Sequence, residues 1–204
     1  MDFYGVSHPC KVGNPYNNCI DLQTNYAKLY NNFFDHKKRE KLKGVFIYIE
    51  DKYVNGYMER YLHSISIDEN QYDLYPCVND ESYAHCKSKC IPNKSIHCVS
   101  SINRAFCYYR LNRIKWISEV ISLANKDDEN IKIWSCTHYD KKGKLVVKRK
   151  VWYKNGLVSF VIIFEEKYKN NNLNLLKFIT AYPVVKKSSE IKFIKEHNKW
   201  IKKK

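Results

Sequence analysis

Basic side chains recur at regular spacing in the second half of this chain, beginning with two arginines. Arg110 and Arg113 lie three residues apart in a segment whose apolar residues have helical spacing, so a helix would turn both toward the protein interior. A buried guanidinium needs a partner, because an unpaired buried charge is costly. The two arginines are therefore expected either to pair with Glu165 or Glu166, or to grip a phosphate through their planar forks.

A second group of candidates lies on a predicted strand at residues 145–153. Alternation places Lys148, Lys150 and Trp152 on one face of this strand and Arg149 on the other. Lysines beside an aromatic ring are typical of a groove that pairs phosphates and stacks bases. The alternative is a sheet face that is open to solvent.

Hydroxyl and imidazole groups complete the candidate catalytic set. Phe178, Thr180 and Tyr182 share a face of a predicted strand at residues 175–184, where the hydroxyls either orient a phosphate or ribose or simply reflect strand propensity. His138 ends another predicted strand and is either structural or a general acid or base. No cysteine nucleophile is expected, because no His–Asp partner set is evident. The candidate catalytic residues are Arg110, Arg113, His138, Lys148, Lys150, Thr180 and Tyr182.

The net charge is concentrated in the second half of the chain. Residues 1–100 hold 12 Lys and Arg against 12 Asp and Glu, whereas residues 101–204 hold 24 against 9, which accounts for the net charge of +15. Such a basic field favours a polyanionic partner, most often nucleic acid. The alternative is a solvated lysine-rich surface that follows from a compositional bias. The candidate nucleic-acid contacts are Arg104, Arg149, Trp152, Lys177, Lys186 and Lys187.

Cysteines are frequent in the first half, which contains six of the eight. Their tightest group has spacing close to that of zinc sites and includes His85 and His97, but it lacks a CxxC pair. A structural zinc site, disulfides and unpaired buried cysteines therefore all stay open. The candidate zinc ligands are Cys77, Cys86, Cys90 and Cys98.

The elements that must position these residues are regular in the second half. The predicted fold class is α+β, with a helix, a four-stranded antiparallel sheet and a second, basic helix. The expected helices cover residues 102–124 and 188–202, and the strands cover 131–138, 145–153, 157–165 and 175–184. Asn155–Gly156 predicts a type I′ hairpin turn, and Ser188 is expected to cap the last helix.

The first half has a different pattern. Helical spacing predicts a helix over residues 20–43 and favours another over 45–65, whereas 66–100 is expected to be irregular and held by cross-links or metal. Charge, cysteine usage and periodicity all change near residue 100. The chain is therefore expected to contain a helical, Cys-rich accessory domain at 1–100 and a second domain at 101–204.

The motifs of the second half resemble one nuclease superfamily. An Arg-x-x-Arg-Ile-x-Trp-Ile pattern at residues 110–117 is followed by the predicted hairpin and by the tetrapeptide TAYP at residues 180–183. This order is similar to that of the barnase–EndoU–colicin–RelE-like (BECR) nucleases, in particular their phage- and toxin-associated branch. The resemblance covers about residues 102–200, and residues 1–100 show none.

The resemblance implies a metal-independent endoribonuclease, a toxin or defence effector that cleaves tRNA or other RNA through a 2′,3′-cyclic phosphate. It implies no cofactor for catalysis, and it implies a cognate immunity or antitoxin protein as a partner besides RNA. Under this hypothesis Arg110 and Arg113 clamp the phosphate, while Thr180 and Tyr182 orient the phosphate or ribose. Lys148 and Lys150 stabilise the transition state, and His138 is the acid or base; no glutamate base is evident at a matching position.

The alternative hypothesis is a non-catalytic RNA- or DNA-binding module whose first half is stabilised by metal. Under either hypothesis no membrane partner is expected, because the sequence has neither a long apolar stretch nor a secretory signal pattern at its N-terminus. A cytoplasmic site of action is expected, and delivery as part of a larger secreted or phage protein stays open.

Overall fold

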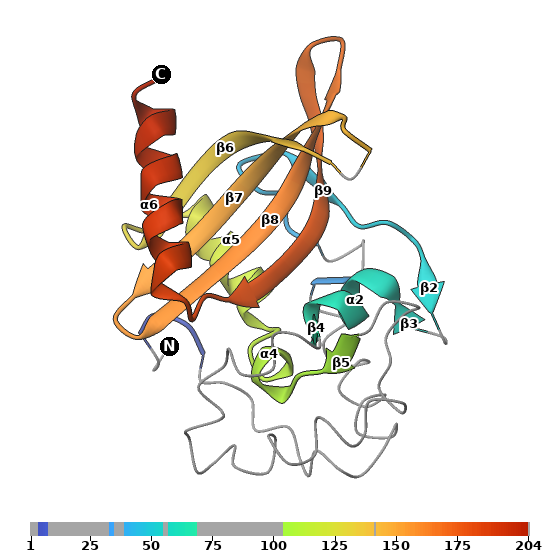
Figure 1. The fold of residues 1–204 in the computed structure, drawn as a ribbon, viewed down its shortest axis with the longest axis vertical. Helices are drawn as coiled ribbons and strands as arrows, with labels where there is room; N and C mark the ends of the chain where they lie inside the picture. Colours follow the sequence, from blue (N-terminus) through green and yellow to red (C-terminus); the bar gives the residue numbers. More distant parts are fainter. Residues whose placement is uncertain are drawn as a thin grey trace.

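The computed structural model describes residues 4–7, 33–34, 39–54, 57–68, 104–140 and 142–203. Its centre is a mixed five-stranded sheet of order β1-β9-β8-β7-β6, with β1 (Phe46–Tyr48) at one edge (Figure 1). The four long strands are consecutive and antiparallel: β6 (Ile131–Tyr139), β7 (Leu145–Asn155), β8 (Val158–Lys169) and β9 (Asn172–Pro183). The α+β class and the helix after the last strand are therefore confirmed. The four predicted strands form an antiparallel meander, but the sheet has a fifth, parallel strand that was not expected.

Two helices pack on opposite faces of this sheet. On β7, Val151 and Tyr153 belong to the same core cluster as α5 (Trp116–Asn125), whereas Trp152 packs with Phe193 of α6 (Lys187–Ile201). The side chains alternate because successive residues of a strand point to opposite faces. Figure 1 shows α5 behind the sheet and α6 in front of it. Among the described residues, no helix is both long and apolar enough to span a membrane.

The predicted helix over 102–124 is only half correct. Its first part forms β5 (Arg104–Phe106) and a single turn, α4 (Tyr108–Leu111), before α5 begins. The strand forms because β5 pairs antiparallel with the distant β4 (Ser66–Asp68), and this tertiary pairing overrides the local helical spacing.

The helix expected over 45–65 is wrong for its first half. Residues Phe46–Tyr48 form β1, which pairs in parallel with the edge of β9. They are followed by the short hairpin of β2 (Tyr53–Val54) and β3 (Tyr57–Met58), and only Glu59–Ser64 are helical, as α2. Residues 39–43, the end of the helix expected over 20–43, are not helical. Within that expected helix, Phe33 and Phe34 are described and lie in a π-helical turn; its other residues, like nearly all of residues 66–100, lie outside the described residues.

One turn and one helix cap differ from the expectation. The β7–β8 hairpin closes through Gly156 and Leu157, and only Gly156 has a positive φ, of 52°, as a type II′ turn requires at its first central position. The expected type I′ turn would need a positive φ at both central residues. Helix α6 begins after Lys186, and no side chain caps it, so the predicted Ser188 cap is wrong.

A bulge in β9 changes which residues share a face. Thr180 pairs with Ile163 and Phe178 pairs with Phe164, so Ile179 is an extra residue of β9 between the partners of two consecutive β8 residues. Consecutive strand residues point to opposite faces. Phe178 therefore packs into the α5 side of the sheet, and the expectation that it shares a face with Thr180 and Tyr182 is wrong.

The larger core cluster contains side chains from both halves of the chain. The rings of Phe33 and Phe34 lie 5.1 Å and 6.1 Å from that of Phe178, and Ile47 of β1 is fully buried beside them. The predicted domains 1–100 and 101–204 thus share a packed core in the part of the chain that the structure describes.

Ion pairs at Glu50 fasten the segment after β1 to β9. Glu50 Oε2 lies 2.9 Å from Lys177 Nζ, and Oε1 lies 3.0 Å from Lys52 Nζ. Hydrogen bonds from Lys177 and Lys52 outweigh the effect of burial and lower the pKa of Glu50 to about 2. Lys177, a candidate nucleic-acid contact, is therefore engaged inside the protein.

Replacing this carboxylate, Glu50→Gln, is expected to lower the free energy of unfolding at neutral pH by about 1 kcal/mol, the scale of partly exposed ion pairs. Because the pKa is lowered in the folded state, this stabilisation is present above pH 4.5 and is lost as the pH falls toward 2. Urea unfolding at pH 7 and pH 2 measures both differences, with the exposed Glu129→Gln as control. A difference that is equally large at pH 2 would contradict the assignment.

Candidate functional site

A pocket of about 330 Å³ lies between α6 and the end of β6. Its lining combines ionisable and polar groups from the edge strand with basic and aromatic groups from the last turns of the helix. The lining residues are Ser135, Cys136, Thr137, His138, Val147, Glu196, Lys199, Trp200 and Lys203. We refer to it as the α6–β6 pocket.

Alternation on β6 and helical spacing on α6 bring these groups together. Trp134, Cys136 and His138 face α6, because the even-numbered residues of β6 point to that side. On α6, Phe193 and Trp200 lie on the stripe that packs on the sheet, and Glu196 falls between them. The ring of Phe193 lies 5.7 Å from that of Trp134, which fixes the helix on the strand.

Four polar side chains meet at the inner end of this pocket. Cys136 Sγ lies 3.1 Å from His138 Nε2 and 3.9 Å from Glu196 Oε2. Glu196 Oε2 also accepts a hydrogen bond of 2.6 Å from Lys150 Nζ and one of 3.1 Å from Trp134 Nε1. All the bonds that Glu196 accepts from described residues reach Oε2, so Oε1 is left for another donor.

The surroundings set the charge state of each group. Burial alone would raise the pKa of Glu196, but the hydrogen bond and charge of Lys150 outweigh it and lower that pKa below 4.5. Burial, with the nearby charges of Lys150 and Lys148, lowers the pKa of His138 below 6.5. Near neutral pH the pocket therefore contains a carboxylate and a neutral imidazole that can take up a proton in mild acid.

The contact between Cys136 and His138 does not create an activated thiolate. Burial raises the pKa of the Cys136 thiol, which therefore stays protonated near neutral pH. Glu196 approaches the sulfur and not the imidazole, so it does not orient His138 as the third member of a cysteine triad would.

The structure places the predicted catalytic residues in two groups. His138 and Lys150 lie together at the α6–β6 pocket, with Lys148 two residues from Lys150 on the same face of β7. Lys150 is only 4 % exposed and is held by Glu196 and between the rings of Trp134 and Phe193. Its ammonium is therefore placed to keep Glu196 ionised and lies too deep for a bound polymer to touch.

The second group lies away from this pocket, and Tyr182 of this group is near the other end of the sheet. The guanidinium of Arg110 donates to the Ser66 carbonyl at 2.7 Å and stands 5.4 Å from the ring of Tyr182, whose pKa is raised by burial. Arg113 donates to the Tyr109 carbonyl at 2.9 Å. Thr180 lies on β9, opposite Ile163 and level with Lys150, and β8 and β7 separate it from β6.

The expected pairing of these arginines with Glu165 or Glu166 is wrong. Glu166 accepts a bond of 2.8 Å from Arg149 and further bonds from Ser135 and Tyr168, while Glu165 pairs with Lys167.

The candidate nucleic-acid contacts also fall into two groups, those bound within the protein and those exposed to solvent. Arg149 is bound to Glu166, and the indole of Trp152 is 2 % exposed and donates to Ser159 Oγ at 3.0 Å, so both serve internal packing. Lys186 and Lys187 are exposed at the start of α6. Arg104 lies on β5, and its side chain is outside the described set.

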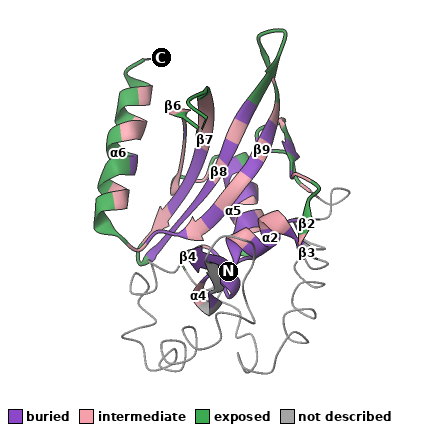
Figure 2. Ribbon diagram, turned by 45° about the vertical axis from the view of Figure 1, so that its right-hand side comes forward, coloured by how far each residue is buried: buried purple, intermediate pink, exposed green. Residues whose placement is uncertain are grey.

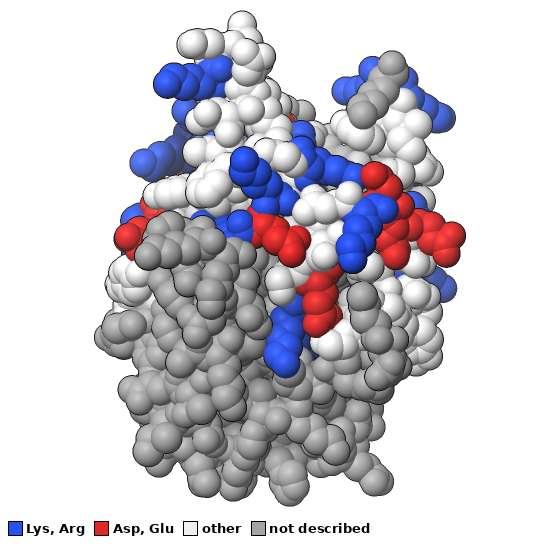
Figure 3. Space-filling model, turned by 180° about the vertical axis from the view of Figure 1, so that it is seen from behind, with Lys and Arg blue, Asp and Glu red and all other residues white. Residues whose placement is uncertain are grey.

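Exposed lysines continue from this point along α6. They are Lys192, Lys195, Lys199, Lys202 and Lys203. Figure 2 shows that α6 is exposed along most of its outer surface. On the opposite side of the molecule, acidic and basic side chains are interspersed (Figure 3).

The four candidate zinc ligands, Cys77, Cys86, Cys90 and Cys98, lie outside the described residues. Within the described part of the chain, one group has suitable donor atoms: those of Cys136, His138 and Glu196 lie within 4.8 Å of one another. Cys136 must lose its proton before it can bind a metal, and Lys150 already occupies Glu196 Oε2. Positive charge from Lys148 and Lys150 disfavours a dication at this place.

Sequence reasoning missed Glu196 and Cys136. The available signals were the Cys-x-His alternation at the end of β6 and the position of Glu196 on the apolar stripe of a basic helix. Neither signal shows that the two elements lie side by side.

Comparisons of the chain with protein-family models, with curated proteins and with solved structures returned no match.

Proposed function

We propose that this protein binds RNA and cleaves it without a metal, using the carboxylate and imidazole of the α6–β6 pocket. The observation that carries the proposal is the meeting of Glu196 and His138 in one pocket. An ionised carboxylate and an imidazole of lowered pKa form a base and an acid with different proton affinities. The resemblance of the second half to BECR nucleases points to the same chemistry.

The chemistry follows from the charge state of each group. Glu196 Oε1 takes the proton of a ribose 2′-hydroxyl, and the 2′-oxygen attacks the adjacent phosphorus. In mild acid, where His138 is protonated, the bond from phosphorus to the 5′-oxygen breaks as His138 gives that oxygen its proton. The products are a 2′,3′-cyclic phosphate end and a 5′-hydroxyl end. Positive charge stabilises the phosphorane, and each well-placed donor contributes about 10²–10³ in rate.

The basic groups around the pocket have distinct parts in this proposal. Lys199 and Lys203 line the pocket and are exposed, so they are the cations placed to meet backbone phosphates. Lys148 lies on the same sheet face as Lys150 and is half-buried, which suits it to a phosphate at the pocket edge. Lys150 acts through Glu196 as a positioning residue.

Incubation of the full chain with total RNA in EDTA tests the proposal. We expect cleavage to persist, and the new 3′ ends to resist direct ligation until a phosphatase that opens and removes cyclic phosphates has acted. Salt-sensitive mobility shifts without cleavage would support the alternative, a non-catalytic RNA- or DNA-binding module. Cleavage that stops on chelation and returns with added metal would contradict the proposed mechanism.

A further inference from the structure

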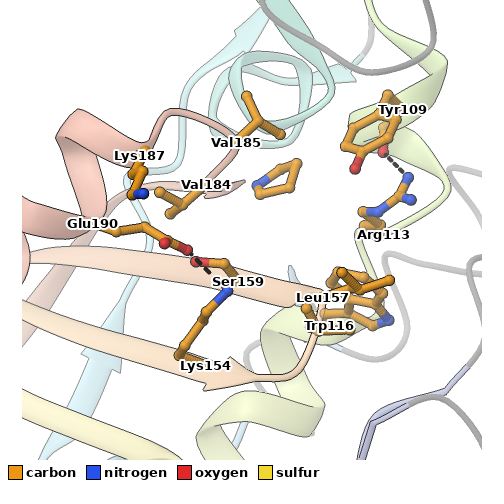
Figure 4. Close-up of a pocket in the computed structure, with 12 residues that line it drawn as sticks. Tyr109, Arg113, Trp116, Lys154, Leu157, Ser159, Val184, Val185, Lys187 and Glu190 are labelled. Carbon is orange, nitrogen blue, oxygen red and sulfur yellow. Dashed lines mark hydrogen bonds and ion pairs between the residues drawn. The ribbon is translucent and has the colours of Figure 1, made fainter. Parts of the chain in front are cut away.

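A second pocket, of about 570 Å³, lies at the other end of α6, within the size range of ligand sites. It is bounded by α4 and the start of α5, by the β7–β8 turn, and by the link from β9 to α6 (Figure 4). Among the described residues, its lining shares no member with that of the α6–β6 pocket.

Arg113 is the unusual residue of this pocket. It is 7 % exposed, yet its hydrogen bond within the described chain is the single one from Nη1 to the Tyr109 carbonyl at 2.9 Å. A guanidinium has five N–H donors, and burying it without a carboxylate leaves its charge uncompensated. Its remaining contacts are with π faces: Cζ lies 3.5 Å from the ring centroid of Tyr109 and 5.2 Å from that of Trp116.

The other charged groups do not neutralise Arg113. The carboxylate of Glu190, the acidic residue of this lining, lies 3.1 Å from Lys154 Nζ and is thereby occupied. Lys187 is exposed at the pocket edge and adds another positive charge. Figure 4 shows Arg113 and Lys187 on opposite sides of the pocket, with Val184 near Lys187. The pocket therefore has a cation on each of two opposite sides, and an apolar wall against which an organic group can pack.

We infer that this pocket binds one nucleotide unit of the RNA, with its phosphate on Arg113 and its base or ribose against the apolar wall that includes Val184. The identification of the ligand as a nucleotide rests on the proposed function. The two cations, the buried Arg113 and the exposed Lys187, are observed independently of that function. Because this pocket is separate from Glu196 and His138, it would hold a nucleotide away from the cleaved bond and favour substrates long enough to fill both pockets.

Calorimetric titration of the full chain with 3′-UMP, 5′-AMP and inorganic phosphate tests this inference. We expect one of the mononucleotides to bind at least tenfold more tightly than phosphate alone, and Arg113→Gln to weaken that binding at least tenfold. Since Arg113 is buried, Lys187→Glu serves as a second variant that leaves the packing intact. We expect Lys187→Glu to weaken nucleotide binding severalfold. Lys202→Glu changes another exposed lysine, at the far end of α6, and should leave nucleotide binding within twofold.

The outcomes separate this inference from the proposed function. Nucleotide binding that is lost in Glu196→Gln but kept in Arg113→Gln and Lys187→Glu would place the ligand in the α6–β6 pocket and overturn the inference. Equal losses of nucleotide affinity in Lys187→Glu and Lys202→Glu would show that binding is general electrostatic attraction, which would also overturn the inference. Binding that depends on Arg113 in a protein that leaves RNA intact would support the pocket and refute the nuclease.

Discussion

Glu196→Gln should reduce the rate of RNA cleavage by about 10²–10⁴, the range of a lost general acid or base. Glutamine keeps the shape of the side chain and its bonds to Trp134 and Lys150, but it cannot take a proton from a 2′-hydroxyl. Single-turnover cleavage of a labelled RNA measures the rate, and Glu129→Gln, an exposed change of the same kind, is the control. Equal rates for the two variants would remove Glu196 from the mechanism.

Removing the carboxylate also leaves Lys150 buried beside a neutral group, which costs stability. The double variant Lys150→Met/Glu196→Gln removes both charges and should recover much of that stability. It should remain as inactive as the single variant. Recovered stability with recovered activity would show that the first loss arose from partial unfolding.

The pH dependence of kcat/KM separates the two partners of the pocket. The rate should rise as Glu196 ionises, below pH 4.5, and fall as His138 loses its proton, below pH 6.5, because the pKa of each group is lowered. Lys150→Met should move the rising limb to higher pH, since burial then acts on Glu196 without its main counter-charge. His138→Asn should abolish the falling limb. A rising limb that does not move in Lys150→Met, or a falling limb that persists in His138→Asn, would contradict the assignment.

Phe178→Ala should destabilise the whole described structure, by about 3–5 kcal/mol. The ring is fully buried on the bulged strand β9, and it contacts Phe33 and Phe34 from the first half as well as Phe164 of β8. Deleting it leaves a cavity where the two halves of the chain meet. A loss of this size is a large part of the stability of a typical domain.

Urea unfolding followed by tryptophan fluorescence measures this loss. Trp134 and Trp152 lie in the other core cluster, on the α6 side, and report the unfolding of the sheet, whereas Trp116 lies in the same cluster as Phe178. Ile194→Ala, an exposed apolar change on α6, should alter stability by less than about 0.5 kcal/mol and is the control. Phe34→Ala should also shift the tryptophan transition, because its ring packs on Phe178 across the two halves. A tryptophan transition that is unmoved by Phe34→Ala would show that residues 1–100 and 101–204 unfold independently.

The sequence by itself determined the four-stranded meander and the helix that follows it. Alternation on β7, the apolar run of β8 and the glycine of the β7–β8 turn are local signals, and local geometry suffices to convert them into strands and a hairpin. The same alternation correctly placed Lys148, Lys150 and Trp152 on one face. The net positive charge of the second half likewise follows directly from its amino-acid composition.

The tertiary structure alone decided which distant segments meet. The pairing of β1 with β9 and of β4 with β5 depends on long-range register, which no local period encodes, and it replaced the helices expected there by strands. The bulge at Ile179 moved Phe178 to the other face of β9 by a single inserted residue. Strands β7, β8 and β9 lie between His138 and Glu196 in the sequence. The two residues are neighbours only because α6 folds back on the edge strand β6. The pocket, and with it the carboxylate that the sequence did not reveal, is a product of that packing.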